Sequence, residues 1–230
     1  MIEDSATWWF PKIKDIDGIN VPKTEMVAMD EDMAITLLAS TATFINEYGP
    51  MFEKALQRFT FPVFIRTDEM ARKHDWKNTC FVKTRDDFYR HVRNLAADST
   101  RIGEQCRAIM IREFLKLESP FECFNGMPVS RERRRYFIDG GDVACHHAYW
   151  HEIAFGFLSP EYKRRLEELN HEPSDEVALL SGMARRVARE FPGAFSVDFA
   201  RDVRGTWWLI DMATAGHSWH EPSCPHRDLK

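Results

Sequence analysis

The apolar positions of this chain follow two periods, one helical and one extended. Residues 33–46 carry apolar side chains at helical spacing, and Asp30 or Asp32 is a suitable N-cap. Tyr48-Gly49-Pro50 is expected to end this helix. Residues 1–25 are expected to be irregular. The complete set of expected helices is 33–46, 51–59, 85–97, 160–169 and 175–191, the last with Ser174 as its cap.

Turn signals separate the extended segments. Asn125-Gly126 and Gly140-Gly141 stand between apolar runs, which is typical of β-hairpins. The expected strands are 61–66, 80–82, 108–115, 121–124, 129–138, 143–150, and two more on either side of a turn centred on Arg204-Gly205. Helices and strands come in mixed blocks rather than in a βα repeat. The pattern therefore predicts an α+β fold with mainly antiparallel sheets.

The composition is that of an ordinary globular protein. The chain has 230 residues, 44% hydrophobic and 29% charged, with a net charge of −5. This length suits one large domain or two small ones. The negative charge provides no general basic field for nucleic acid or membranes. No apolar run approaches the roughly 20 residues that span a bilayer. Five scattered cysteines and no signal-peptide pattern predict reduced thiols and a cytoplasmic location.

Two aspartates stand on the last expected hairpin. Asp198 and Asp211 would face each other across the strands if the turn centres on Arg204-Gly205. Directly opposed side chains have Cβ atoms roughly 4.5–5.5 Å apart, where like charges repel. A cation between them would relieve this repulsion, and Mg²⁺ commonly binds one or two carboxylates together with nucleotide phosphates. Alternatively, these are strand-end carboxylates bonded to arginine or to backbone.

A group of cations follows the strand 61–66. Arg66 ends that strand, and the next loop carries Arg72, Lys73 and His74. Arginine binds phosphate in a bidentate manner and lysine acts as a point charge, so the loop could hold an anion. Acidic residues are interleaved with these cations: Asp68, Glu69 and Asp75. The alternative is therefore a solvated loop with internal ion pairs.

A second group of cations lies on the strand 129–138. Alternation places Glu132, Arg134 and Tyr136 on one face and a row of three arginines on the other. Such a row requires anions or partner carboxylates. The alternative is a solvent-facing edge strand that its charges protect against aggregation. A nucleic-acid partner for Arg131–Arg135 is possible but is disfavoured by the net charge.

Three further segments carry weaker signals. The strand Ile109–Leu115 ends in charged and bulky residues and could wall a flat aromatic ligand, although a core strand is the simpler interpretation. The tail contains four potential zinc ligands, in no standard spacing: His217, His220, Cys224 and His226. Cys145-His146-His147 is interpreted as part of a strand with ordinary histidines. No Walker A loop, GxGxxG motif or nucleophile elbow is present.

Taken in order, these motifs resemble a divergent, arginine-containing branch of the ATP-grasp family. That branch also includes the eukaryotic cell-division-cycle protein that helps to assemble a translation initiation factor. The resemblance covers about residues 60–215. The matching segments are a phosphate loop at 61–82, a hinge at 111–114, a Glu-x-Arg-x-aromatic strand at 132–136, and metal-binding strands at 197–199 and 208–212.

The resemblance implies ATP and Mg²⁺ as cofactors and a role for each matching residue. Arg66 and Lys73 would hold the phosphates, and Arg134 would face the transferred phosphate or the acceptor, so that Lys73 and Arg134 are the catalytic candidates. Asp198 and Asp211 would bind Mg²⁺. The ATP-binding set is completed at the hinge, where backbone would contact adenine, by Arg112, Glu113, Phe114 and Leu115.

The implied activity is an ATP-dependent carboxylate–amine type ligase that acts through an acylphosphate on an unknown small-molecule, peptide or protein acceptor. Alternatives are a non-catalytic ATP-binding assembly chaperone for a protein partner, and a nucleic-acid-acting protein of the same fold. One position departs from the family pattern: Ala213 stands where an asparagine usually adds a metal ligand. This departure puts turnover in doubt more than ATP binding.

The expected organisation has four parts. Residues 1–60 would form an N-terminal region packed on the domain, followed by a small ATP-grasp subdomain at 61–115, a large subdomain at 116–220 and a tail at 221–230. The nucleotide is expected between the two subdomains.

Overall fold

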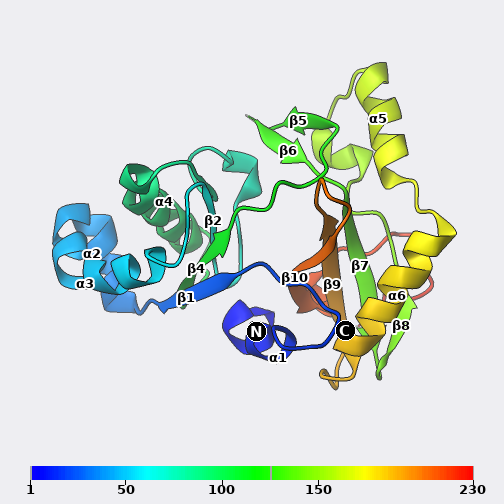
Figure 1. The fold of residues 1–230 in the computed structure, drawn as a ribbon, viewed down its shortest axis with the longest axis horizontal. Coiled ribbons are helices and arrows are strands. Elements are labelled where there is room, and N and C mark those ends of the chain that lie inside the picture. Colours follow the sequence, from blue (N-terminus) through cyan, green and yellow to red (C-terminus); the bar gives the residue numbers. More distant parts are fainter. Residues whose placement is uncertain (1, 125, 230) are drawn as a thin grey trace. The chain divides into compact units, whose positions relative to one another are not determined.

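The computed structural model describes residues 2–124 and 126–229, without the side chains of Arg134 and Arg135 (Figure 1). The chain forms two compact units. The small unit comprises Pro22–Leu115 and Phe124–Met127. The large unit comprises Met1–Val21, Lys116–Cys123 and Pro128–Lys230.

The small unit is a sheet covered by helices. Its four antiparallel strands have the order β1-β4-β2-β3, with β1 Thr24–Ala28, β2 Val63–Thr67, β3 Phe81–Val82 and β4 Ala108–Glu113. Its α-helices are α2 Glu31–Ala39, α3 Thr41–Leu56 and α4 Phe88–Arg101, with 3₁₀ turns at η2 Lys73–Asp75 and η3 Arg85–Asp87. One apolar cluster contains side chains from the helices and the strands, among them Phe52, Leu95 and Ile111. The core of the unit therefore lies between these helices and one sheet face.

The helical segment 31–56 divides at a different residue from the one predicted. Asp30 caps α2, as expected, and accepts a hydrogen bond from the Met33 N–H at 2.8 Å. The division falls at Ser40, whose extended backbone and side chain cap α3. The predicted break at Tyr48-Gly49-Pro50 is wrong, since α3 continues through Pro50. Burial of Phe44 and Phe52 on either side of the proline offsets the lost backbone hydrogen bond.

The large unit also contains a four-stranded antiparallel sheet. Its order is β10-β9-β7-β8, with β7 Glu132–Asp139, β8 Asp142–Cys145, β9 Phe195–Arg201 and β10 Trp207–Thr214. The helices are α1 Ala6–Ile13, α5 Pro160–Asn170 and α6 Ser174–Ala188, and the 3₁₀ turns are η1 Ile2–Asp4, η4 Glu152–Phe155 and η5 Ala215–His217. A separate pair joins β5 Phe121–Cys123 to β6 Met127–Val129. The predicted α+β class with antiparallel sheets is confirmed.

The N-terminal segment is more regular than the sequence pattern indicates. The prediction of an irregular segment at 1–25 is wrong, because α1 begins after Ser5, whose hydroxyl accepts from the Thr7 N–H at 3.3 Å. Burial of Trp9 and Ile13 holds this short helix despite its internal proline. Residues 1–60 do not form one region: α1 belongs to the large unit, whereas β1 pairs with β4 of the small unit.

The expected strand 129–138 is interrupted, and the next strand is shorter than expected. The Ser130 carbonyl accepts from the Trp150 indole N–H at 2.9 Å, so the chain leaves the ladder between β6 and β7. β8 ends at Cys145 rather than at Trp150. Among the described residues, none of the helices has the length and apolar content required to cross a membrane.

Candidate functional site

The two aspartates of the last hairpin are direct cross-strand neighbours. Asp198 of β9 is paired with Asp211 of β10, so the predicted opposition is confirmed. The hairpin begins in another register, in which Leu209 faces Phe199 and Ile210 would face Asp198. A β-bulge between Leu209 and Asp211 adds one residue and brings the second aspartate into place. The bulge, as well as the turn, therefore sets the pair.

A second irregularity lies on the other side of Asp198. In the ladder between β7 and β9, Arg133 faces Phe199 and Tyr136 faces Val197. Residues 134 and 135 of β7 therefore stand against the single residue Asp198. The backbone of Arg134 lies level with the aspartate pair, while the side chains of Arg134 and Arg135 lie outside the described part of the chain. Bulges are over-represented beside active sites, where they redirect side chains.

Burial makes this position electrostatically demanding. Asp198 is only 2% exposed, and Asp211 is half-buried. Opposed carboxylates destabilise a sheet, and burial of charge in a sheet is costly. A divalent cation with oxygen ligands could be bound by both carboxylates at once.

The turn that starts the hairpin is organised by Asp202. Its carboxylate accepts from the Thr206 N–H at 2.9 Å and from the Trp208 indole at 3.1 Å. Burial opposes ionisation of Asp202, but these hydrogen bonds and those from Arg204 outweigh it, so its pKa is lowered. Gly205 adopts a φ of +86°, which favours glycine. Asp202 thus fixes the turn from which the register of the hairpin is counted.

The arginines of β7 are neutralised within the large unit. Arg133 is fully buried, and its Nε donates to Glu176 Oε1 at 2.5 Å. Arg131 donates to the second oxygen of Glu176 at 3.1 Å. The interpretation of this segment as an edge strand is wrong, because β7 lies between β9 and β8. The predicted row of charges therefore has a partner carboxylate on α6.

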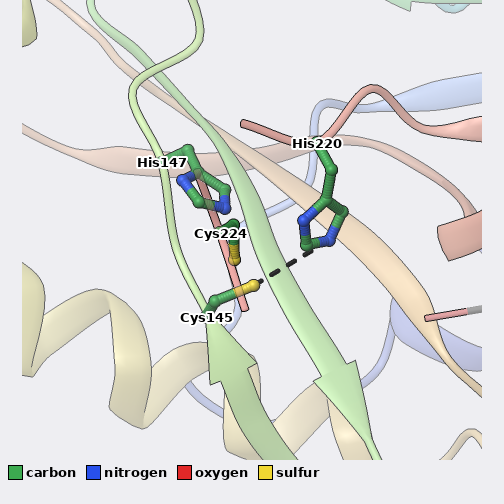
Figure 2. Close-up of side chains that lie close together, drawn as sticks. All are labelled: Cys145, His147, His220 and Cys224. Atoms are coloured by element: carbon green, nitrogen blue, oxygen red, sulfur yellow. Dashed lines mark hydrogen bonds between the residues drawn. The ribbon is translucent and has the colours of Figure 1, made fainter. Parts of the chain in front are cut away.

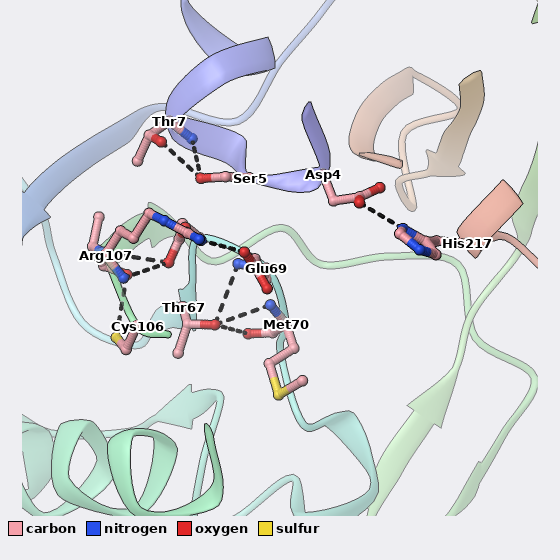
Figure 3. A network of polar contacts seen from close by, with 11 residues as sticks. Asp4, Ser5, Thr7, Thr67, Glu69, Met70, Cys106, Arg107 and His217 are labelled. Atoms are coloured by element: carbon pink, nitrogen blue, oxygen red, sulfur yellow. Dashed lines mark hydrogen bonds and ion pairs between the residues drawn. The ribbon is translucent and has the colours of Figure 1, made fainter. Parts of the chain in front are cut away.

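In the small unit, Arg66 lies on β2 before the expected phosphate loop. Its side chain is 3% exposed, and its Nε donates to the Thr67 carbonyl at 3.1 Å. The Thr67 hydroxyl accepts from the Met70 N–H at 3.0 Å and shapes the start of the loop (Figure 3). Lys73 begins the turn η2 further along the same loop.

The acidic residues of the loop have partners outside it. Asp68 accepts from the backbone N–H of Arg107 at 2.9 Å, and Glu69 pairs with the Arg107 guanidinium (Figure 3). Arg72 lies 3.7 Å from Asp98 of α4. The expected alternative of ion pairs confined to the loop therefore does not describe these contacts.

The expected hinge lies where β4 ends. Arg112 is buried in the strand, and the Glu113 N–H donates to the Lys23 carbonyl at 3.0 Å. That N–H is occupied within the unit, so acceptors and donors for an adenine edge remain on the later hinge backbone. The Phe114 ring lies 5.0 Å from Phe81, which in turn stacks on Trp76 at 5.5 Å. Sequence reasoning placed the hinge but missed these two aromatic neighbours, whose only signal was their position at the end of the loop.

A different group of residues is also brought together in the large unit. The ligand atoms of two cysteines and two histidines lie within 4.8 Å of one another: Cys145, His147, His220 and Cys224. The sequence pattern indicates ordinary strand residues for the first two and no partner pair for the last two. The structure instead places all four side chains in one cluster.

Comparison with known proteins identifies the family. The sequence model of an ATP-grasp domain, the third family of its arginine-containing clade, matches residues 52–228. The chain belongs to this family, and the predicted resemblance is confirmed. Comparison with curated protein sequences gave no match.

Comparison with solved structures supports the same fold. C-terminally truncated Cdc123 from Schizosaccharomyces pombe superposes with a TM-score of 0.61 at 12% identity, over 93% of this chain and 84% of that one. N5-carboxyaminoimidazole synthetase from Staphylococcus aureus, complexed with ADP, gives 0.48 at 11%, over 94% and 47%. D-alanine-D-alanine ligase from Helicobacter pylori gives 0.40 at 13%, over 92% and 50%. The chain spans about half the length of these last two proteins.

Proposed function

We propose that this protein binds ATP with Mg²⁺ and acts as an ATP-dependent ligase of the carboxylate–amine type. Membership of the ATP-grasp family supports the nucleotide. The observation that carries the proposal is the pairing of Asp198 with Asp211, flanked by a bulge in each neighbouring strand.

In this proposal Asp198 and Asp211 hold Mg²⁺. The donor set fits, since Mg²⁺ is commonly held by one or two carboxylates and keeps water and phosphate in its remaining positions. The ion would supply positive charge to the nucleotide phosphates. Ala213 provides no further ligand, and its partner across the ladder is Ser196, whose hydroxyl bonds to Ser218 at 2.6 Å.

Arg66 and Lys73 are proposed to bind the phosphates. The buried position of Arg66 fixes its guanidinium at one depth, while Lys73 lies on a loop whose ends are tied by Thr67 and Thr79. Such preorganised cations stabilise the charge that develops during phosphoryl transfer. We propose that the hinge backbone at Glu113–Leu115 contacts adenine, next to the aromatic cluster around Phe114.

The proposed reaction has two steps. A carboxylate oxygen of the acceptor attacks the γ-phosphorus of ATP, the bond to the β-phosphate oxygen breaks, and ADP leaves with an acylphosphate formed. An amine then attacks the acyl carbon and inorganic phosphate departs, with loss of the amine proton. Lys73 and Arg134 are the residues proposed to neutralise the transferred phosphoryl group, so no nucleophilic side chain is required.

Nucleotide turnover tests the ligase proposal. ADP release is measured with ATP, Mg²⁺, and pools of carboxylates and amines, and the productive pool is subdivided. ADP formed only in the presence of one acceptor pair, with an equal amount of condensed product, supports the ligase. Mg-ATP binding with no ADP above the buffer rate in any pool counts against it.

The second candidate is a non-catalytic ATP-binding assembly chaperone. Two observations favour it: the missing third ligand at Ala213, and the fold shared with Cdc123. It predicts Mg-ATP binding without turnover and a protein partner whose retention depends on nucleotide. Capture experiments with and without Mg-ATP compare the two states.

A nucleic-acid-acting protein is the third possibility. Arg131 and Arg133 are already paired with Glu176, so this activity would depend on Arg134 and Arg135. Retention on polynucleotide that falls steeply with salt supports it.

A further inference from the structure

The cluster of two cysteines and two histidines lies apart in sequence from every residue assigned to the nucleotide. Cys145 is the last residue of β8, and His147 follows it by two positions. His220 and Cys224 belong to the tail after η5. Figure 2 shows the four side chains converging from these two segments of the large unit.

The distances suit a single tetrahedral metal ion. With Zn–S near 2.3 Å and Zn–N near 2.0–2.1 Å, the ligand atoms of a tetrahedral site lie about 3.3–3.8 Å apart. In this structure the four ligand atoms all fall within 4.8 Å of one another, and Cys145 Sγ is 3.9 Å from His220 Nε2. Small side-chain rotations therefore close the cluster around an ion.

The donor set selects the metal. Two thiolates and two imidazoles in a tetrahedral arrangement are typical of zinc, whereas Mg²⁺ and Ca²⁺ require oxygen ligands. Four protein ligands also complete the coordination shell, which is the mark of a structural rather than a catalytic site. The ligands come as two local pairs, Cys145/His147 and His220/Cys224, and this is how structural zinc joins two distant segments.

The surroundings are built to hold the ligands. Phe137 of β7 is fully buried, and its ring centroid lies 3.6 Å from that of His220. Cys224 is buried, and its sulfur accepts a hydrogen bond from the His226 backbone N–H at 3.4 Å. An N–H directed at sulfur favours a thiolate, the form that binds a metal.

The tail has a physical need for such a link. Residues 218–229 form no helix or strand, and short terminal segments stay ordered only when they are tied down. We propose that the four residues bind one structural Zn²⁺, which fastens the tail to the end of β8: Cys145, His147, His220 and Cys224.

The competing chemistry is a disulfide between Cys145 and Cys224. It would join the same two segments by oxidation of both thiols and would leave the two histidines without a common role. Thiol counting and intact mass under non-reducing conditions distinguish the two cases.

The test uses the full chain, purified with a cleavable tag that contains no histidine, under reducing conditions. Elemental analysis is expected to give about one zinc per chain. After chelation, Co²⁺ is expected to restore the site with the visible ligand-field bands of a tetrahedral ion and a thiolate-to-cobalt charge-transfer band. The chelated protein is expected to unfold at a lower temperature, because the ion binds only the folded chain.

Cys224→Ser is expected to lose the zinc, whereas His226→Ala, which changes an exposed tail histidine beside the cluster, is expected to keep it. If the serine variant does not fold, the Co²⁺ titration of the wild-type chain decides. A reduced wild-type chain that binds neither zinc nor cobalt overturns the proposal, as does a folded Cys224→Ser that retains one zinc. These results do not depend on ATP, so the zinc proposal and the nucleotide proposal fail separately.

Discussion

Replacing Arg133 by methionine removes the most completely buried charge that the structure describes in the β7 strand. The guanidinium is 0% exposed and donates to Glu176 at 2.5 Å, to the Leu169 carbonyl at 2.9 Å and to the His171 carbonyl at 2.7 Å. Methionine fills a similar volume without donors, so Glu176 keeps a buried carboxylate with one arginine fewer. Removing one partner of a buried ion pair costs about 3–5 kcal/mol.

Urea unfolding followed by circular dichroism measures this loss. With an m-value of about 1–3 kcal/mol/M, the midpoint is expected to fall by about 1–3 M. The matched control is Arg185→Ala, which breaks an ion pair with Asp142 whose side chains are 52% and 69% exposed. Exposed pairs contribute about 0–1 kcal/mol, so this control should scarcely change the midpoint.

The double variant Arg133→Met with Glu176→Leu is expected to regain part of the loss, because no carboxylate is then left without its partner. A free energy of unfolding for Arg133→Met within about 1 kcal/mol of the wild-type value refutes the assigned role of this arginine.

The remaining predictions concern the hairpin turn, the phosphate loop and the metal ligands. Asp202→Asn is expected to lower the free energy of unfolding at pH 7 by about 1–3 kcal/mol, as measured by urea unfolding. Because the pKa of Asp202 is lowered in the folded state, the wild-type chain loses this contribution as the pH falls below about 3.9, and the two stability curves should converge in acid; parallel curves would contradict the assignment. Lys73→Ala should weaken Mg-ATP binding about tenfold or more by calorimetry, since a charge-assisted hydrogen bond is lost, whereas Lys77→Ala, an exposed lysine of the same loop, should not. Ala213→Asn adds an oxygen ligand and should raise the Mg²⁺ dependence of nucleotide affinity; an unchanged titration would show that position 213 does not serve the metal.

Local patterns predicted the elements whose signals are local. The Gly140-Gly141 turn, the hairpin around Gly205 and the cap at Asp30 all depend on a few neighbouring residues, and each is present. Helix α1 was missed because its stability comes from burial of Trp9 and Ile13, which the sequence does not display.

The site was predictable in its residues but not in its geometry. The aspartates could be chosen from their place on two apolar strands, yet their pairing depends on the bulge at Ile210, which no local rule places. The cysteine and histidine pairs were visible separately. Their meeting depends on where β8 ends and on the path of the tail, and tertiary structure alone decides both.

Calorimetric titration of the full chain with ATP, with and without Mg²⁺, tests the central claim most directly when wild type and Asp211→Asn are compared. The account predicts Mg²⁺-dependent binding by the wild-type chain and its near-complete loss in Asp211→Asn, with an unchanged unfolding midpoint. Absence of binding by the wild-type chain, or equal affinity in the variant, would contradict it.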